Sequence, residues 1–497
     1  MISRSEASKM KPEPESVEET DVVVVGGGTA GFTAAYAAAR TGAKTVLIEN
    51  ASFLGGTTTG GLVDSMTGWR VTRYPDQGEQ YTQLSTEQTV GGFPVEFIGR
   101  LKAAGGAWLP DDKVTTMIAI DPESVKIVME EMLEEAGVDI WYLTQFIDAV
   151  VEEGRVIGVV VASEAALHLI WCKAAVDASG DGDLAVRAGA DFQFGRPNDG
   201  KPQPVTLAYM LGGVDFERFV EYLKENPEEV VRPEKRIDFR QTITAEMVEE
   251  YYRKGWPILM QGLGKAASQA AANGEFPVPM GGDRPAAFSG VSQAMKGGKV
   301  VWSVSEYCGQ DMGFGVDSTD HRQMRAALIA GRKFALSLAR FYKKYVPGFE
   351  DSYLIQTASI LGVRESRRIV GDYMLTEEDT RQCREFDDAV GRSGCRLDIH
   401  APDLQSRGAA SDIGPKGWYH IPYRVLLPKG IEGLLVAGRC ASNAHVAHAS
   451  MRHQAICMVT GHAAGTAAAL AVQQDTTPRR LEVEGLQATL RNQGAII

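Results

Sequence analysis

The sequence predicts an α/β fold (α+β overall), with a parallel β-sheet, an antiparallel meander and a discontinuous substrate-covering domain. Three observations near the N-terminus of the 497-residue chain support this prediction. The four valines at 22–25 are typical of a strand buried on both faces. The alanine-rich segment 29–40 favours a helix that ends before Gly42. A second apolar run, 44–48, then leads to Glu49.

Three glycines join the first strand to the helix at G-x-G-x-x-G spacing. Gly26 permits a tight turn, Gly28 leaves room for a phosphate beside the backbone, and Gly31 allows the helix to pack closely on the sheet. Glu49, at the tip of the second strand, suits a ribose hydroxyl, and the helix N-terminus suits a pyrophosphate. This order predicts a Rossmann-like dinucleotide-binding unit rather than a glycine-rich turn without a ligand.

The next segments extend the sheet. The loop 51–62 carries Gly55 and Gly56 followed by three threonines, and it either wraps the dinucleotide or is a plain surface loop. A helix is expected from Asp121, as N-cap, to Ala136, followed by a strand over 138–143. Alternation over 146–178 predicts the antiparallel meander. The turn 179–182 after it either approaches the dinucleotide or is an Asx-type turn without a ligand.

The C-terminal half predicts a long amphipathic helix over 317–345, a buried strand over 433–438, a turn with histidines, and a small-residue helix from about Met451. A last helix is expected over 482–491. Residues 1–20 are assigned to a disordered lead-in, 21–62, 113–191 and 417–497 to the dinucleotide-binding domain, and 63–112 and 192–416 to a substrate-covering domain.

Composition excludes several classes of function. The formal net charge of −13 disfavours nucleic acid and anionic membranes as partners. No pair among the six cysteines has C-x-x-C spacing, so no metal site is assigned. No apolar run reaches about 18 residues, so no membrane span is expected. Scattered thiols and an N-terminus without an apolar leader segment indicate a cytoplasmic protein, and a homo-oligomer is compatible with the sequence.

Together, these blocks resemble the FAD-dependent oxidoreductases among the glutathione-reductase-like, two-dinucleotide-binding flavoproteins. Fumarate reductase and succinate dehydrogenase flavoproteins are broader relatives. The resemblance spans 21 to about 471, and its marks are the glycine fingerprint, LGGTTTGG, DASGDGDL, GVRESRRIVGDYMLT, and IPYRVLLPKGIEGLLVAGRCAS with GHAAG after it.

The resemblance implies an extended FAD, with Glu49 at the adenosine ribose, Phe146 at the end of the third strand offering backbone to adenine, and Arg439 where many flavoproteins carry an aspartate. The start of the last small-residue helix would face the flavin pyrimidine edge. The implied cofactor-binding residues are Gly26, Gly28, Thr29, Ala30, Gly31, Glu49, Asn50, Gly56, Thr57, Thr58, Phe146, Ala178, Gly180, Asp181, Gly438, Arg439, Gln454 and Ala455.

Candidates for catalysis are charged or histidine residues in the two C-terminal blocks, and each has a structural alternative. The RESRR arginines either bind an anionic group or pair with Glu365 and Asp372. His420 is either an acid/base or a structural hydrogen-bonding residue. The cluster of His445, His448 and His453 lacks metal-ligand spacing, and one member could accept a proton. The catalytic set is His420, His448, Arg364, Arg452 and His445.

The preferred interpretation is a dehydrogenase or oxidase that moves a hydride between a C–O or C–N bond of a small polar molecule and flavin N5. Only one strand–glycine–helix fingerprint occurs, so no nicotinamide domain is expected, and the electron acceptor would be oxygen, a quinone or a carrier protein. The alternatives are a flavin-dependent reductase of an activated C=C bond and a flavoprotein electron-transfer subunit.

Overall fold

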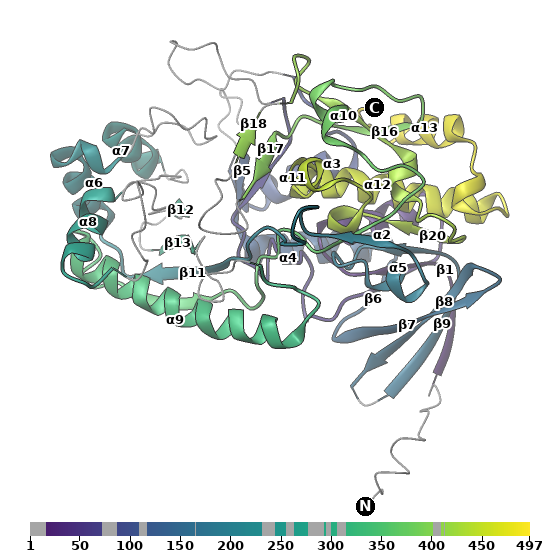
Figure 1. Ribbon diagram of the computed structural model, residues 1–497, viewed down its shortest axis with the longest axis horizontal. Coiled ribbons are helices and arrows are strands. Elements are labelled where there is room, and N and C mark those ends of the chain that lie inside the picture. Colours follow the sequence, from purple (N-terminus) through teal and green to yellow (C-terminus); the bar gives the residue numbers. More distant parts are fainter. Residues whose placement is uncertain are drawn as a thin grey trace, which may run out of the picture.

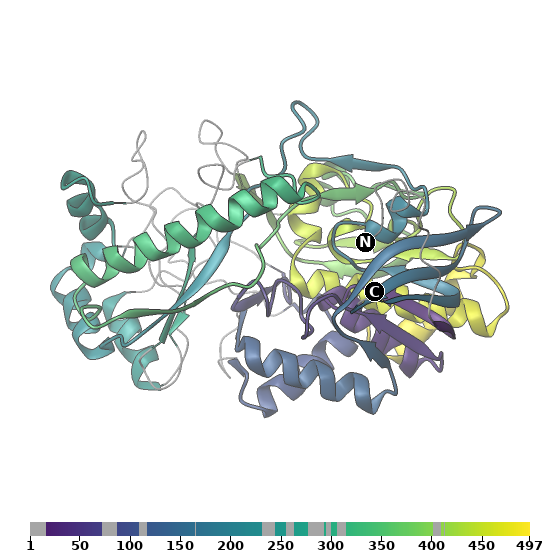
Figure 2. The same ribbon diagram turned by 90° about the horizontal axis from the view of Figure 1, so that it is seen from below.

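The computed structural model describes residues 16–71, 87–108, 117–164, 166–230, 244–254, 263–276, 293–294, 300–305, 315–400, 409–411 and 413–497. Two groups of elements lie side by side along the long axis (Figure 1). One contains the large sheet and both ends of the described chain. The other contains four helices and a small sheet, and the long helix α9 (His321–Tyr345) runs along it towards the first group (Figure 2).

The large sheet has the order β6-β2-β1-β9-β8-β7, and β20 also pairs with β9. The pairs among β6, β2, β1, β9 and β20 are parallel, whereas β7, β8 and β9 form the antiparallel meander. The predicted α/β fold class is therefore confirmed. The strands are β1 (Ser16–Val25), β2 (Thr45–Ile48), β6 (Asp139–Trp141), β7 (Thr144–Glu152), β8 (Arg155–Ser163), β9 (Ala166–Asp177) and β20 (Leu434–Val436).

Local sequence signals predict the bounds of helices α2 and α4 to within one residue. Helix α2 spans Thr29–Arg40, as predicted. Helix α4 spans Pro122–Glu135, and the carboxylate of Asp121 caps it by accepting a hydrogen bond from the Ser124 N–H at 3.0 Å. One prediction was wrong: β1 begins at Ser16, so residues 16–20 extend the strand instead of belonging to a lead-in. Residues 1–15 lie outside the described chain.

Helix α12 (Gln454–Gln473) is the central helix of the main core and packs on α2. A Cβ at Gly461 would lie 2.1 Å from the Ala30 carbonyl oxygen, and one at Gly465 would lie 2.0 Å from that of Ala34. Only glycine permits this approach of two backbones. Within the described chain, α12 alone is long and apolar enough to cross a membrane, and 89% of its most apolar window is buried inside the protein.

The described residues of 63–112, which were assigned to the substrate-covering domain, contribute instead to the main core. Its helix α3 (Phe93–Ala103) buries Phe97, Ile98 and Leu101 in the same apolar cluster as Phe32 of α2. Apolar residues three or four positions apart form the buried face of this helix. The strands β3 (Ser65–Thr67), β4 (Ala107–Trp108) and β5 (Met117–Ile120) form a small antiparallel sheet beside it.

The second group has its own apolar cluster, which includes Phe219, Phe341, Tyr342 and Phe349. Its antiparallel sheet has the order β12-β13-β11-β14. Helix α9 begins four residues later than predicted, with Asp320 as its N-cap. The elements are β11 (Leu207–Gly212), β12 (Gln293–Ala294), β13 (Val300–Ser305), β14 (Tyr353–Thr357), α6 (Phe216–Glu225), η1 (Pro227–Glu229), α7 (Ala245–Lys254) and α8 (Gly264–Ala272).

The described chain also contains three two-stranded sheets. Strand β10 (Phe192–Phe194) pairs with β15 (Arg367–Ile369), β16 (Ala389–Ser393) with β19 (Tyr419–Pro422), and β17 (Leu397–Ile399) with β18 (Ala409–Ser411). The predicted turn with histidines is a helix, α11 (His445–Met451). The remaining elements are α5 (Asp183–Arg187), α10 (Glu377–Arg381), α13 (Val483–Asn492), η2 (Tyr423–Leu426), η3 (Gly438–Cys440) and η4 (Pro478–Arg480).

Candidate functional site

The glycine turn between β1 and α2 has free space beside Gly28 and none beside Gly31. A Cβ at Gly31 would lie 1.7 Å from the Gly26 carbonyl oxygen, so helix and turn touch there. A Cβ at Gly28 would meet only one heavy atom within 4 Å, the Gly56 Cα at 4.0 Å. Gly28 is the N-cap of α2 and offers no side-chain cap, so the N–H groups of the first turn, which includes Thr29 and Ala30, face this open space.

The glycine–threonine loop, residues 51–62, lies on the other side of this open space. The space between Gly28 and Gly56 is called the cradle. Gly55 pairs with Gly28 in an isolated parallel bridge, and the Gly55 N–H donates to the Gly27 carbonyl at 2.9 Å. A Cβ at Gly56 would lie 3.1 Å from the Gly28 Cα. The hydroxyl of Thr58 is buried without a hydrogen-bond partner, and the half-buried Thr57 precedes it. An open cradle and an orphaned hydroxyl fit a ligand with many acceptor atoms.

Glu49 is held by backbone amides at the tip of β2. Its Oε2 accepts a hydrogen bond from the Gly27 N–H at 2.7 Å, and its Oε1 accepts one from the Ala51 N–H at 2.8 Å. Burial raises the pKa of this carboxyl, and the N–H groups of Ala51, Gly27 and Asn50 partly oppose that rise. The carboxylate is thus fixed beside the glycine turn, whereas Asn50, the next residue, is exposed.

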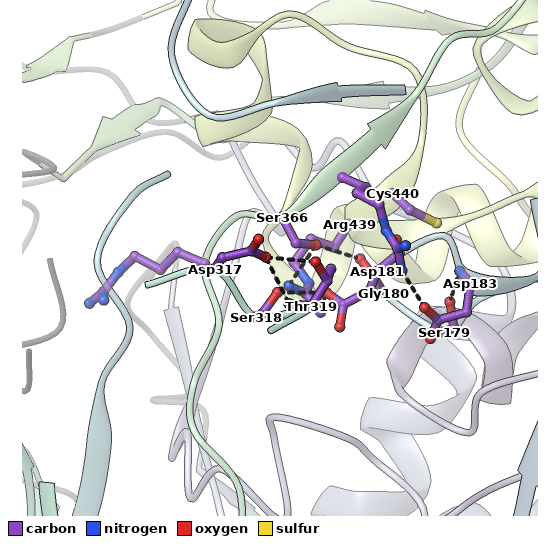
Figure 3. A network of polar contacts seen from close by, with 12 residues as sticks. Ser179, Gly180, Asp181, Asp183, Asp317, Ser318, Thr319, Ser366, Arg439 and Cys440 are labelled. Atoms are coloured by element: carbon purple, nitrogen blue, oxygen red, sulfur yellow. Dashed lines mark hydrogen bonds and ion pairs between the residues drawn. The ribbon is translucent and has the colours of Figure 1, made fainter. Parts of the chain in front are cut away.

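The side chain of Arg439 packs against the turn 179–182, which follows β9. Its Nη2 lies 2.9 Å from Asp181 Oδ1, and its Nη1 donates to the Ser366 hydroxyl at 3.2 Å (Figure 3). A Cβ at Gly180 would lie 2.6 Å from Arg439 Nη2. Burial alone would raise the pKa of Asp181, but Arg439 and the hydroxyls of Ser366 and Ser318 hold it below its usual range.

The predicted position of Phe146 was wrong. It lies within β7, opposite Val161 of the meander, rather than at the end of the third parallel strand, β6. Ala178, in contrast, lies at the edge of the glycine turn, because its N–H donates to the Val25 carbonyl at 2.8 Å.

The C-terminal block returns to the same edge. The Gly438 N–H donates to the Thr460 hydroxyl of α12 at 2.9 Å, and a Cβ at Gly438 would lie 2.8 Å from the Ala30 Cβ. Helix α12 begins at Gln454, whose Nε2 donates to the Ser65 carbonyl at 3.2 Å, and Ala455 behind it is buried.

A buried polar cluster surrounds Glu365, which is fully buried. Its Oε1 accepts hydrogen bonds from His445 Nδ1 at 2.8 Å and from Arg368 Nη1, and its Oε2 accepts one from the Gln203 N–H at 3.0 Å. Burial alone would raise the pKa of Glu365, but the His445 hydrogen bond and the charge of Arg368 bring it to about 2. Because Nδ1 of His445 donates to this carboxylate, Nε2 is the ring nitrogen that can act on a ligand.

His448 lies one turn further along α11, and both of its ring nitrogens are engaged. Nδ1 lies 3.0 Å from Asn443 Oδ1, and Nε2 lies 3.0 Å from the Arg364 carbonyl. Burial, with the charge of Arg368, lowers the pKa of His448 to about 3, so the ring is neutral near pH 7. Arg364 itself directs Nη1 to the Pro204 carbonyl at 2.7 Å.

The other RESRR arginines make structural ion pairs. Arg368 pairs with Glu365, and Arg367 pairs with Asp183 rather than with either acid expected from the sequence. Asp372 pairs instead with Arg479.

A second polar cluster lies at the start of α12. Arg452 Nη2 donates to the Asp398 carbonyl at 2.8 Å and to its Oδ2 at 3.2 Å, and His400 Nε2 donates to the same Oδ2 at 3.1 Å. Burial alone would raise the pKa of Asp398, but His400 and Arg452 hold it well below its usual range.

His420 is not brought to the other catalytic candidates. On β19 its neighbours Tyr419 and Ile421 are in the main core, and the Tyr419 hydroxyl donates to the Ser450 hydroxyl of α11 at 2.9 Å. Because successive strand residues alternate sides, His420 points away from α11 and stacks on Trp418, with ring centroids 5.3 Å apart.

Several residues of these clusters had no signal in the sequence. Gln203 and Asp398 stand in no motif, and each meets its partners across long stretches of chain. Gln203 and Glu365, for example, are 162 residues apart. Only the fold brings them together.

A parallel sheet with an open glycine cradle and a fixed carboxylate at its edge defines a dinucleotide-binding protein of the flavoprotein type. The chain belongs to the family described as FAD dependent oxidoreductase, whose family model matches residues 21–490. It is an enzyme of that family with FAD as its cofactor, and the cradle and the Thr58 hydroxyl fit this group.

Similar solved structures match most of the chain at low identity. One is a geranylgeranyl bacteriochlorophyll reductase-like protein from Thermoplasma acidophilum, with 13% identity over 96% of this chain and 85% of that chain and a TM-score of 0.43. Another is the myxobacterial chondrochloren halogenase, with 14% identity, 96% and 79% coverage and a TM-score of 0.40. At these values neither carries an argument about activity. No curated protein matches the sequence.

Proposed function

We propose that this protein is an FAD-dependent dehydrogenase or oxidase that acts on a C–O or C–N bond of a small polar organic substrate. When bound, FAD supplies the hydride acceptor, flavin N5. The single observation that carries the proposal is the Glu365–His445 pair, in which a buried carboxylate holds Nδ1 of the imidazole. Oxidation of an alcohol or amine also requires a group that takes the proton from oxygen or nitrogen, and His445 Nε2 suits this task.

The surroundings of Glu365 support its role as a positioning residue. Arg368 donates Nε to the Asn443 carbonyl at 3.0 Å and Nη2 to the Gly195 carbonyl at 2.9 Å, so the guanidinium that braces Glu365 is itself fixed. A base whose tautomer and orientation are set before substrate binds loses less rotational freedom during the reaction.

The position of this pair along the chain also supports the proposal. Ser366, the next residue after Glu365, accepts a hydrogen bond from Arg439 and donates to the Gly180 carbonyl at 3.4 Å. Gly180 and Arg439 belong to the set proposed to hold FAD, together with the glycine cradle, Glu49, Gly438 and the start of α12. His445 would therefore act close to the cofactor.

The test is anaerobic stopped-flow with the holoenzyme and panels of alcohols, amines and sugar-like compounds, with flavin absorbance as the readout. In His445→Gln we expect flavin reduction by the true substrate to slow by about 10²–10⁴-fold with FAD still bound. The exposed His321 at the start of α9 provides the matched control, and His321→Gln should react at the wild-type rate. His448→Gln should lower the melting temperature, because the fully buried neutral ring loses the one hydrogen bond that it donates, to Asn443 Oδ1 or to the Arg364 carbonyl.

Two results would contradict the proposal. One is a His445→Gln enzyme that is reduced as fast as the wild type. The other is a wild-type enzyme that no alcohol, amine or sugar-like compound reduces, but whose reduced form is rapidly reoxidised by an enoate, which would favour the C=C reductase. Reoxidation with oxygen, a quinone or a carrier protein then identifies the acceptor.

A further inference from the structure

Buried donors without a partner lie near the start of α12. Gln203 Nε2, His453 Nε2 and Arg452 Nε are all buried and have no hydrogen-bond partner. Gln203 is fully buried, and His453 is 8% exposed. A buried donor left unsatisfied costs about 1–3 kcal/mol, and native proteins contain few of them. Unpartnered donors on three side chains therefore point to a ligand that supplies acceptors.

One hydrogen-bonded network joins Gln203 and Arg452, and His453 is the next residue in the chain. Gln203 Oε1 accepts the His400 N–H at 3.1 Å, which fixes the orientation of the amide and leaves Nε2 as its remaining donor. His400 and Arg452 both donate to Asp398 Oδ2. His453 follows Arg452 in the chain, and its Nδ1 lies 2.5 Å from the Thr67 hydroxyl; with Nδ1 assigned as the acceptor from this hydroxyl, Nε2 carries the ring proton and is a donor.

The electrostatics of the network favour an anion. His453 is the N-cap of α12, a helix of 20 residues, and no side chain caps that end. The Arg452 guanidinium directly precedes this helix end, and a guanidinium stabilises negative charge. Burial, with the charge of Arg452, lowers the pKa of His453 to about 3, so its neutral ring can donate one hydrogen bond without bringing a second charge.

The network also touches the proposed proton acceptor. The Gln203 N–H donates to Glu365, the residue that holds His445, while the Gln203 side chain holds His400. One residue therefore connects the unpartnered donors to the base, which suits a substrate with an anionic group a few bonds from its reacting carbon.

We propose that Gln203, Arg452 and His453 bind a carboxylate of the substrate, so that the substrate class is a small hydroxy acid or amino acid. This proposal rests on the proposed function for the reaction itself, but carboxylate binding can be measured without turnover.

The test is equilibrium binding to the oxidised holoenzyme, measured by perturbation of the flavin absorbance. The probes are L-lactate and glycine, with lactamide and glycinamide, in which an uncharged amide replaces the carboxylate, and inorganic phosphate as a second anion. We expect the two carboxylates to bind at least tenfold more tightly than their amides and than phosphate.

Gln203→Glu is the sharpest variant. It keeps the acceptor for the His400 N–H and replaces the unpartnered donor with a carboxylate oxygen, so the dissociation constants of lactate and glycine should rise about 10- to 100-fold. Gln193→Glu on β10 adds the same charge at an exposed position and should leave them unchanged. Arg452→Lys is a second variant that keeps a cation beside Asp398 but removes Nε, and should weaken carboxylate binding about tenfold.

Equal binding of acids and amides, tighter binding of phosphate, or unchanged affinity in both variants would overturn the carboxylate site. Loss of FAD from both variants with unchanged carboxylate affinity would also overturn it, because the donors would then hold the cofactor. Intact carboxylate binding without flavin reduction by any substrate panel would count against the proposed function alone.

Discussion

Replacing Gly28 with alanine should separate cofactor binding from folding. An alanine Cβ there would have the Gly56 Cα at 4.0 Å as its nearest neighbour, and Gly28 has φ −64° and ψ −178°, which alanine adopts without strain. The free energy of unfolding of the apoprotein should therefore change by less than about 1 kcal/mol. The methyl group would, however, occupy the cradle between Gly28 and Gly56.

The expected loss in FAD affinity follows from the contacts that a phosphate makes in such a cradle. Hydrogen bonds to charged groups contribute about 1.5–3 kcal/mol, so displacement of one such contact should raise the FAD dissociation constant about 10- to 100-fold. Gly31→Ala is the contrasting variant. Its Cβ would lie 1.7 Å from the Gly26 carbonyl oxygen, so the backbone must shift, and the unfolding free energy should fall by about 1–3 kcal/mol or more.

The assay combines titration of apoprotein with FAD and thermal unfolding of each apoprotein. Gly485→Ala on α13, where a Cβ meets nothing within 4 Å, reports the effect of a glycine-to-alanine change alone. If Gly28→Ala binds FAD as tightly as wild type, or loses as much stability as Gly31→Ala, the cradle is not the phosphate site.

Three further outcomes are expected. Gly465→Ala should lower the melting temperature, because its Cβ would lie 2.0 Å from the Ala34 carbonyl oxygen; a melting temperature equal to that of Gly485→Ala would contradict this. Burial lowers the pKa of His462 to about 4, below its unfolded value near 6.5, so wild type should lose stability relative to His462→Gln by about 1.4 kcal/mol per pH unit as pH falls from 6.5 to 4 in urea titrations. NADH or NADPH should not reduce the flavin in a saturable manner, since the sequence has one dinucleotide fingerprint; saturable reduction in stopped-flow would refute this.

The sequence predicts those elements whose signals are local. Helix α2 and the cap at Asp121 follow from propensity and capping within a few residues of chain. The start of β1 was missed because residues 16–19, SVEE, lack an apolar pattern, and their strand conformation depends on pairing with β9. Helix α11 was missed because Ala444, its N-cap, makes no side-chain cap.

The residues of the candidate site also fall into those that local sequence predicts and those that only the fold brings together. Gly28, Gly56 and Glu49 could be named from the sequence because one βαβ unit and the loop after it contain them. The Glu365–His445 pair joins residues 80 positions apart, and no spacing rule predicts which of several histidines will face that carboxylate. Once the bounds of β19 are known, the alternation of side chains along a strand shows that His420 points away from α11.

Arg439 illustrates how the fold can explain a residue that the sequence leaves puzzling. The resemblance places an acid at this position in many flavoproteins, and here a cation follows Gly438. The structure supplies an acid from a different strand, because Asp181, after β9, lies 2.9 Å from the guanidinium. Strands β9 and β20 are parallel neighbours, so the residues that follow them meet at one edge of the sheet. An acid and a cation at these positions compensate each other, so the pair adds no net charge beside the place proposed for the FAD phosphates.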